Sequence, residues 1–131
     1  MSRLDWYAWL GVTLFVVMLG VAGCVEKADA APARRGTIAY CEQHAAGIVE
    51  RKCIVRVVFG RRHGRDAVRV AWCESRLDPR AVNGQFRGVF QMGAAERRRY
   101  GHGPTVAAQS WAARRYFVAS GSDWSPWSCK P

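Results

Sequence analysis

The stretch AWCESRLDPRAVNGQFRGVFQM, residues 71–92, decides the fold, because a helix end, a helix stop and a hairpin turn follow one another within it. The helix begins upstream of this stretch, and some of its residues recur at i, i+3, i+4 and i+7, which places them on one face. These residues are Ala67, Val70, Ala71 and Glu74. A carboxylate therefore stands at the end of an otherwise apolar stripe, directly after a cysteine.

The residues after this helix predict a small β-hairpin. Asp78 precedes Pro79, and a proline disfavours the helical conformation of the residue before it, so we expect the helix to stop there. Asn83-Gly84 is typical of a type I′ turn between two short antiparallel strands. Gly84 and Gly88 also leave room for a close approach of the backbone or of a ligand. The sequence thus predicts an α+β fold that is mostly helical.

The flanking segments predict one domain. Apolar residues recur with helical spacing over residues 37–59, although the run CIVRVVF at 53–59 is also compatible with a buried strand. We expect the basic segment GRRHG, residues 60–64, to form a loop. No internal repeat is present, and residues 37–131 suffice for one small core. Residues 24–36 are rich in alanine, proline and charge, which is typical of a tether.

Residues 1–23 are predicted to be an export signal, because Arg3 precedes a nearly uninterrupted apolar run. The sequence VAGC, which ends at Cys24, resembles a bacterial lipobox, where signal peptidase cuts before a lipid-modified cysteine. Cleavage before Ala31 is one alternative, and an uncleaved membrane anchor over residues 6–23 is another. All three place the rest of the chain outside the cytoplasm, either anchored to a membrane through its N-terminus or secreted.

The chain of 131 residues is strongly cationic, with 20 Lys and Arg residues against 10 Asp and Glu residues and a net charge of +10. The expected signal contains one charged residue of each sign, Arg3 and Asp5, so its removal leaves the net charge unchanged. The folded surface should therefore attract a polyanion, and nucleic acid, anionic lipid and bacterial wall polymer are the candidates.

The chain has five cysteines. Setting aside Cys24 as the lipid site leaves an even set in an oxidising compartment, which favours two disulfides. We pair Cys41 with Cys53, because both lie in one expected helical hairpin. We pair Cys73 with Cys129, which would tie the C-terminal segment to the helix described above, although the sequence alone allows three connectivities. Irregular spacing of the cysteines and histidines disfavours a metal site, so we expect neither a metal nor a cofactor.

The position of Glu74 suits a general acid. A carboxylate at the edge of an apolar environment has its ionised form disfavoured and its pKa raised. A glutamic acid can in this way stay protonated near neutral pH and donate to a leaving group. The simpler alternative is a surface glutamate at a frayed helix end, and the pattern alone leaves both interpretations open.

Several short motifs between residues 65 and 129 together resemble a known family. They are CES at 73–75, AVNGQFRGVFQM at 81–92, YGHG at 100–103, AARRYF at 112–117 and DWSPWSC at 123–129. The combination resembles small bacterial lytic transglycosylases of the lysozyme-like superfold. The resemblance implies a lysozyme-like domain with a small β-hairpin beside a sugar-binding cleft. It also implies cleavage of the β-1,4 bond between N-acetylmuramic acid and N-acetylglucosamine in peptidoglycan.

The same resemblance assigns roles to individual residues. Glu74 matches the catalytic acid/base of the family, and Ser75 matches its helper. Gln91 matches a cleft residue, and Tyr116 matches a late tyrosine that hydrogen-bonds near the acid. Ser75, Gln91 and Tyr116, together with Asn83, form the expected substrate-binding set. A weaker similarity to resuscitation-promoting factors rests on the Cys-Glu-Ser motif and the C-terminal cysteine, but residues 76–92 depart from the Trp-bearing, glycine-rich segment usual there.

The acidic residues of the domain favour a mechanism with a single carboxylate. Ordinary glycosidases need a pair, whereas a transglycosylase can manage with one, because the sugar's own N-acetyl group and 6-hydroxyl supply the nucleophilic steps. We expect Asp78 to be a helix-stop residue and Glu96 to pair with the arginines at 97–99. Asp78 as a second carboxylate would instead give a hydrolytic muramidase, which stays an alternative.

A binding function is the second alternative. A cationic exported domain could adhere to anionic wall polymer through arginines alone. The residues in question are Arg61, Arg62, Arg65, Arg97, Arg98 and Arg99. Because no helix-turn-helix signature or metal-ligand constellation is present, we do not expect a nucleic-acid partner. The expected partners are peptidoglycan glycan strands and, through the N-terminus, a membrane, and we expect a monomer.

Overall fold

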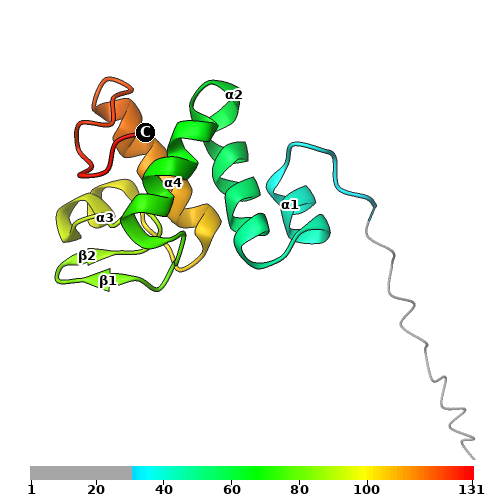
Figure 1. The fold of residues 1–131 in the computed structure, drawn as a ribbon, viewed down its shortest axis with the longest axis horizontal. Coiled ribbons are helices and arrows are strands. Elements are labelled where there is room, and N and C mark those ends of the chain that lie inside the picture. The colour runs from blue at the N-terminus through cyan, green and yellow to red at the C-terminus, as the bar shows by residue number, and fades with distance from the viewer. Residues whose placement is uncertain (1–30) are drawn as a thin grey trace, which may run out of the picture. The chain divides into compact units, whose positions relative to one another are not determined.

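The computed structural model of the protein describes residues 31–131, which contain four helices and one two-stranded sheet (Figure 1). The predicted signal and the lipid site at Cys24 lie outside the described residues. In chain order the elements are α1 (Ile38–His44), α2 (Gly47–Ser75), β1 (Val82–Asn83), β2 (Phe86–Arg87), α3 (Ala94–Tyr100) and α4 (Val106–Ala119). The prediction of a mostly helical α+β chain is confirmed, and residues 31–36 of the expected tether contain no helix or strand.

Helix α1 begins where the sequence supplies a cap. The hydroxyl of Thr37 accepts a hydrogen bond from the backbone N–H of Tyr40 at 3.2 Å, which satisfies one of the free donors of the first turn. Cys41, on the buried face of α1, forms a disulfide with Cys53 in α2, and their Cα atoms are 5.6 Å apart. This confirms the first of the two predicted disulfides and fixes α1 against α2.

Helix α2 bends sharply at Gly60, where φ is 74° and ψ is −177° (Figure 1). This conformation is accessible to glycine and strained for other residues. The predicted loop over residues 60–64 is therefore wrong: the helix resumes at once after Gly60, because one glycine absorbs the whole change of direction. Gly64 then lies so close to the backbone of Arg56 that a Cβ atom there would stand 2.9 Å from the Arg56 carbonyl oxygen.

The hairpin forms as predicted, with its turn one residue further along. Val82 pairs with Arg87 and Asn83 with Phe86, so Gly84 and Gln85 form the turn rather than Asn83 and Gly84. Gly84 takes the positive φ of 58°. A glycine at the first position of a two-residue turn can supply that conformation without an asparagine, so Asn83 stays in the strand.

The core lies mainly between α2 and α4, with the hairpin and α3 at one end and α1 at the other (Figure 1). Phe59 of α2 contacts the rings of Phe90, Phe117 and Trp124, at centroid distances of 5.4, 5.8 and 5.4 Å. Phe117 is buried in this core, whereas Trp111 on the same helix is 37% exposed.

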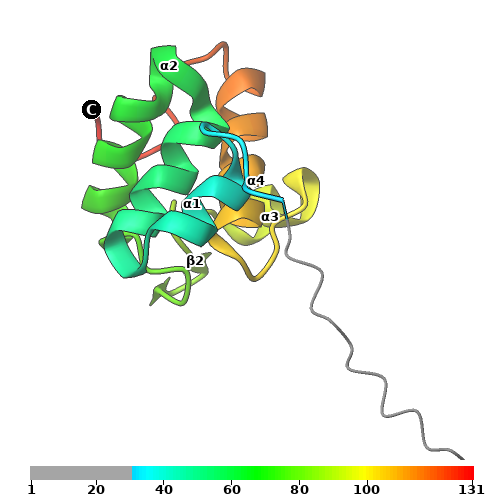
Figure 2. The same ribbon diagram turned by 90° about the vertical axis from the view of Figure 1, so that its right-hand side faces the viewer.

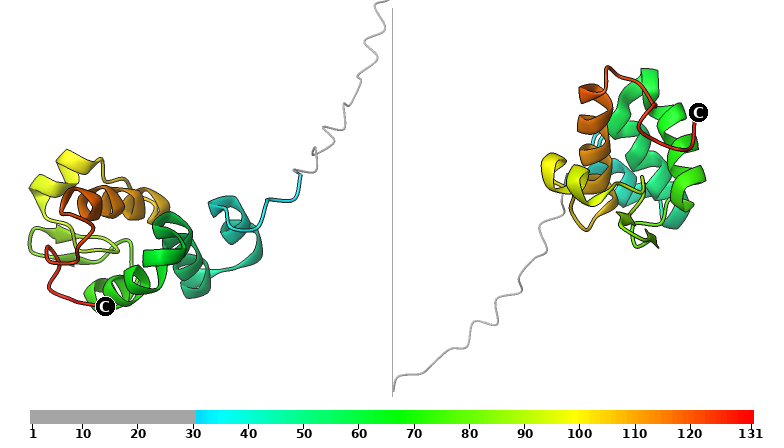
Figure 3. Two further views of the ribbon diagram at one scale, coloured as in Figure 1. Left: turned by 90° about the horizontal axis from the view of Figure 1, so that it is seen from above. Right: turned by 90° about the vertical axis from the view of Figure 1, so that its left-hand side faces the viewer.

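The C-terminal segment packs back onto this core and reaches the end of α2 (Figure 3). The indole N–H of Trp127 donates to the carbonyl of Phe90 at 3.0 Å, and both Trp124 and Trp127 are buried. Cys129 forms a disulfide with Cys73, which confirms the second predicted pair. Among residues 31–131, no helix is long and apolar enough to cross a membrane.

Candidate active site

A cavity of about 400 Å³ opens where the end of α2, the hairpin, α3, α4 and the C-terminal segment meet. It is lined by Glu74, Asn83, Gln85, Phe86, Gln91, Met92, Gly93, Glu96, Tyr116, Pro126, Trp127 and Ser128. Four residues predicted from the sequence, Glu74, Asn83, Gln91 and Tyr116, are brought together here from separate parts of the chain. Ser75 is the predicted site residue that does not line the cavity.

Glu74 is positioned by an abrupt end of α2. The helix ends at Ser75, three residues before the predicted stop at Asp78, because Arg76 and Leu77 both adopt left-handed conformations, with φ of 58° and 63°. Such conformations cost non-glycine residues about 1–3 kcal/mol each, so the surrounding packing must enforce them. Leu77 is fully buried. Its burial anchors the turn that leaves Glu74 on the last helical turn, at the rim of the cavity.

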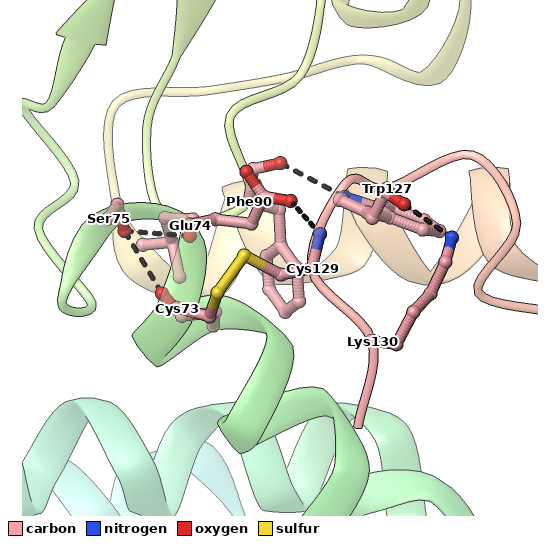
Figure 4. The surroundings of a disulfide bond; sticks show 9 residues. Cys73, Glu74, Ser75, Phe90, Trp127, Cys129 and Lys130 are labelled. Atoms are coloured by element: carbon pink, nitrogen blue, oxygen red, sulfur yellow. Dashed lines mark hydrogen bonds between the residues drawn. A yellow bond between two sulfur atoms is a disulfide. The ribbon is translucent and has the colours of Figure 1, made fainter.

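One oxygen of the Glu74 carboxyl group is held by the C-terminal segment. The backbone N–H of Cys129 donates to Glu74 Oε1 at 3.0 Å, and the neighbouring Cys73–Cys129 disulfide fixes that N–H in place (Figure 4). The other oxygen, Oε2, accepts no hydrogen bond from residues 31–131. Glu74 is only half-buried. The hydrogen bond to Oε1 thus orients the carboxyl group, and Oε2 remains available to bind a ligand.

Ser75 acts behind the cavity rather than in it. Its hydroxyl donates to the carbonyl of Val89 at 2.8 Å and to that of Ala71 at 3.3 Å. The bond to Val89 ties the last turn of α2 to the loop that follows the hairpin. In the structure the Ser75 hydroxyl thus contacts the backbone of this loop and does not line the cavity.

Gln109 holds the same loop from the other side and was not identified from the sequence. Its side chain is 2% exposed, its Oε1 accepts the N–H of Val89 at 2.8 Å, and its Nε2 donates to the carbonyls of Pro79 at 3.0 Å and Pro104 at 3.4 Å. The sequence did offer a signal for this role. Gln109 shares a face of α4 with Ala112 and Ala113, and a polar side chain buried on such a face needs hydrogen-bond partners.

Gln91 and Asn83 present amide groups to the cavity. Gln91 has a positive φ of 45°, and its Nε2 donates to the carbonyls of Gly88 at 3.0 Å and Ala81 at 3.3 Å. The amide oxygen of Gln91 makes no hydrogen bond within the described residues, and Asn83 is exposed at the end of β1. Both side chains retain groups that can bind a polar ligand.

Tyr116 reaches the cavity from α4 between two aromatic rings. Its ring centroid lies 5.1 Å from that of Tyr100 and 5.2 Å from that of Trp127. Burial raises the pKa of the Tyr116 phenol, and the negative charge of Glu96 and the neighbouring Tyr100 raise it further. The phenol therefore stays protonated and can donate a hydrogen bond over the whole physiological range.

Glu96 is a second carboxylate in the cavity, which the sequence analysis assigned to a surface ion pair. The expected pairing with the arginines at 97–99 is not formed within residues 31–131, and Arg97 donates instead to the carbonyl of Met92 at 2.7 Å. The Glu96 carboxylate folds over Gly93, where a Cβ atom would overlap it. Glycine at position 93 thus makes room for the carboxylate at the cavity wall.

Asp78, the second carboxylate considered from the sequence, does not line the cavity. Its Oδ1 accepts the backbone N–H of Arg80 at 2.9 Å, which is a turn contact. Asp78 was expected to stop the helix. In the structure α2 already ends at Ser75, and Asp78 stabilises the turn that follows.

The charge of the cavity is opposite to that of the chain. Its lining contains two carboxylates, Glu74 and Glu96, and no lysine or arginine, although the chain has a net charge of +10. The cavity therefore suits an uncharged or cationic part of a ligand, and anionic groups are attracted elsewhere on the surface. Residues 31–131 contain no group of three or more His, Cys, Asp or Glu side chains that could hold a metal ion.

His102 is not part of this site. Its Nε2 is buried without a hydrogen-bond partner among the described residues. Burial lowers its pKa, and the nearby positive charge of Arg97 lowers it further. His102 is therefore neutral near pH 7 and packs beside Gly88 as a loop residue.

Comparison of the chain with protein-family models, curated proteins and solved structures finds no match.

Proposed function

We propose that the protein is a peptidoglycan lytic transglycosylase with a lysozyme-like domain, which cleaves the β-1,4 bond between N-acetylmuramic acid and N-acetylglucosamine. The observation that carries the proposal is the convergence of Glu74, Asn83, Gln91 and Tyr116 on one cavity. The resemblance of the sequence motifs assigns Glu74 to catalysis and Gln91 and Tyr116 to the neighbourhood of the acid in the cleft, and Asn83 belongs to the expected substrate-binding set.

In the proposed reaction Glu74 acts first as an acid. Its Oε2, which is free of other partners in the described structure, carries the proton to the glycosidic oxygen, while Oε1 stays fixed by the N–H of Cys129 at 3.0 Å. The bond between the anomeric carbon of the muramic acid and this oxygen breaks, and the sugar's N-acetyl group stabilises the positive charge that develops there. The leaving chain departs with a free hydroxyl.

Glu74 then acts as a base. Its carboxylate takes the proton of the 6-hydroxyl of the same sugar, and that oxygen bonds to the anomeric carbon to close a 1,6-anhydro ring. No water is consumed, and Glu74 ends the cycle protonated, as it began. Such general acid/base steps are worth about 10²–10⁴-fold in rate each.

The other lining residues suit the uncharged parts of a sugar chain. The phenol of Tyr116 and the amides of Gln91 and Asn83 offer hydrogen bonds to hydroxyl and N-acetyl groups. Phe86, which is 43% exposed at the hairpin, offers an apolar face to a sugar ring. The absence of cationic side chains from the lining fits the neutral backbone of a glycan rather than an anionic small molecule.

The proposed compartment is the cell exterior. Two disulfides indicate an oxidising environment outside the cytoplasm. The cationic surface would hold the domain close to anionic wall material. Attachment through a lipid on Cys24, or through an N-terminal anchor, would keep it at the membrane.

Glu96 supports hydrolysis as the second candidate. A retaining or inverting glycosidase uses two carboxylates across the scissile bond, and Glu96 lines the same cavity as Glu74. In that case Glu96 would act as the nucleophile or would activate a water molecule. In the muramidase alternative, the second carboxylate would therefore be Glu96 and not Asp78.

Mass spectrometry of the fragments released from purified peptidoglycan separates the two reactions. Transglycosylation leaves 1,6-anhydro ends, which are lighter by one water than the reducing ends that hydrolysis produces. We expect anhydro ends from the unmutated protein, and the same products at a similar rate from Glu96→Gln. Reducing ends alone, together with a loss of about 10²-fold or more in Glu96→Gln, would replace the transglycosylase by a muramidase.

A further inference from the structure

A second open groove, of about 890 Å³, lies at the bend of α2, away from the residues that line the catalytic cavity. It is lined by Gly36, Arg56, Val57, Gly60, Arg61, Arg62, Gly64, Arg65 and Asp66. The segment that leads into α1 passes beside the bend and contributes Gly36 (Figure 2). No residue of this groove also lines the catalytic cavity.

Two glycines build the groove. Gly60 supplies the bend through its positive φ of 74°. Gly64 allows the second half of α2 to approach the backbone of Arg56 closely, since a Cβ atom there would stand 2.9 Å from a carbonyl oxygen. The bend brings arginines from both halves of the helix, Arg56 before it and Arg61 after it, to one groove. A straight helix would spread these side chains along its length.

The four arginines of the groove have no partner among the described residues. These residues, Arg56, Arg61, Arg62 and Arg65, are exposed, and their side chains make no hydrogen bond or ion pair with any residue of 31–131. The one acid of the groove, Asp66, contacts Arg69 at 3.5 Å. Mutual repulsion of clustered guanidinium groups is unfavourable unless an anion is bound between them.

We propose that this groove binds the phosphodiester backbone of a polyol-phosphate polymer of the cell wall. Guanidinium groups bind phosphate oxygens through paired hydrogen bonds, and several exposed ones in a row suit a repeating polyanion better than a single small ion. The groove has no aromatic lining residue on which nucleic-acid bases could stack. The disulfides indicate an oxidising compartment outside the cytoplasm, and the proposed function places wall polymer in that compartment.

The role of the groove would be to hold the protein on the wall while the separate cavity acts. The choice of a wall polymer as the ligand rests on the proposed function. Because Arg56, Arg61, Arg62 and Arg65 are distinct from the proposed catalytic residues, a failure of binding can be told apart from a failure of catalysis. The sequence analysis expected adhesion through arginines spread over the surface, whereas this proposal assigns binding to one groove. Arg97, which was included in that expectation, is instead engaged with backbone carbonyls beside the cavity.

The test measures binding of the full chain to poly(glycerol phosphate) in a neutral detergent, with Glu74→Gln present in every sample so that no cleavage intervenes. One variant carries Arg61→Gln and Arg62→Gln. The matched control carries Arg98→Gln and Arg114→Gln, which remove the same charge from exposed positions outside the groove. Circular dichroism of each variant checks that the fold is kept.

Counterion release sets the expected size of the effect. Four phosphate contacts on a flexible polyanion predict that affinity falls about 50-fold between 50 and 200 mM salt, and two contacts predict only about 7-fold. At about 0.1 M salt, Arg61→Gln/Arg62→Gln should therefore bind about 20-fold more weakly than the parent. The Arg98→Gln/Arg114→Gln control should change affinity by less than about 3-fold, since it removes no direct contact.

Equal losses in the two double variants would overturn the proposal, because they would show that net charge alone drives binding. Tighter binding of a DNA duplex than of poly(glycerol phosphate), with the same dependence on Arg61 and Arg62, would overturn it in favour of nucleic acid. Tighter binding to vesicles that contain phosphatidylglycerol would overturn it in favour of the membrane surface.

Discussion

The two disulfides provide a controlled comparison between stability and activity. Removing the Cys73–Cys129 bond, as Cys73→Ala/Cys129→Ala, frees a loop with a sequence separation of 56 residues, whereas Cys41→Ala/Cys53→Ala frees one of 12. The loss of loop-closure entropy predicts destabilisation of about 4 kcal/mol for the longer loop and about 3 kcal/mol for the shorter. The two variants should therefore differ from each other in stability by only about 1 kcal/mol, and both should be less stable than the parent.

Their activities should differ. The Cys73–Cys129 bond holds the backbone N–H of Cys129 at 3.0 Å from Glu74 Oε1, whereas the Cys41–Cys53 bond joins α1 to α2, and neither of its cysteines lines the cavity. A hydrogen bond to a charged group is worth about 1.5–3 kcal/mol. Its loss predicts about a 10- to 100-fold lower rate per folded molecule for Cys73→Ala/Cys129→Ala.

Urea unfolding gives the stability of each variant, and digestion of purified peptidoglycan, at a temperature where circular dichroism shows both to be folded, gives the activity. Cys41→Ala/Cys53→Ala should keep the parent's rate under these conditions. The reasoning is refuted if folded Cys73→Ala/Cys129→Ala retains full activity, or if both variants lose activity equally. Either result would mean that the contact between Cys129 and Glu74 does not position the carboxyl group.

Two further predictions concern residues that support the cavity from outside. Gln109→Met leaves the buried N–H of Val89 and the carbonyl of Pro79 without their partners. It should lower the free energy of unfolding, measured in urea, by about 2–4 kcal/mol. The exposed control Gln43→Met should lower it by less than about 0.5 kcal/mol. In the folded protein the pKa of His102 is lowered below its ordinary value of 6.5. As the pH falls below about 6.5, the unfolded chain therefore takes up a proton on this histidine before the folded chain does. The free energy of unfolding should decrease as the pH falls from about 6.5 through the folded pKa. His102→Gln should flatten this part of the stability profile, and a profile identical to the parent's would contradict the assignment.

The sequence predicted most of what depends on local chemistry. The α2 stripe that ends at Glu74 and the short hairpin follow from residue spacing and turn residues. The even cysteine count predicts two disulfides, and the expected helical hairpin suggested which cysteines pair. The convergence of Glu74, Gln91 and Tyr116 followed from the motif resemblance, because spacing alone does not bring residues of different elements together.

The differences arise where tertiary packing decides. Gly60 looked like the start of a loop, since nothing local shows that a single positive φ can redirect a helix without ending it. Glu96 looked like a partner for its neighbouring arginines, but exposed ion pairs contribute little, and the side chain folds over Gly93 into the cavity instead. Gln109 gained its role from the carbonyls and N–H groups of a distant loop, which no local pattern reveals.

The most direct test of the proposed function compares Glu74→Gln with the parent on purified peptidoglycan. Glutamine keeps the shape of the side chain and its acceptor for the N–H of Cys129 but cannot transfer the proton. We expect release of fragments to fall by about 10²–10⁴-fold, while the fold and the salt-dependent adhesion to the wall persist. The matched control Glu42→Gln, on the exposed face of α1, should digest like the parent. Digestion by Glu74→Gln at the parent's rate would contradict the catalytic assignment and leave adhesion as the better account.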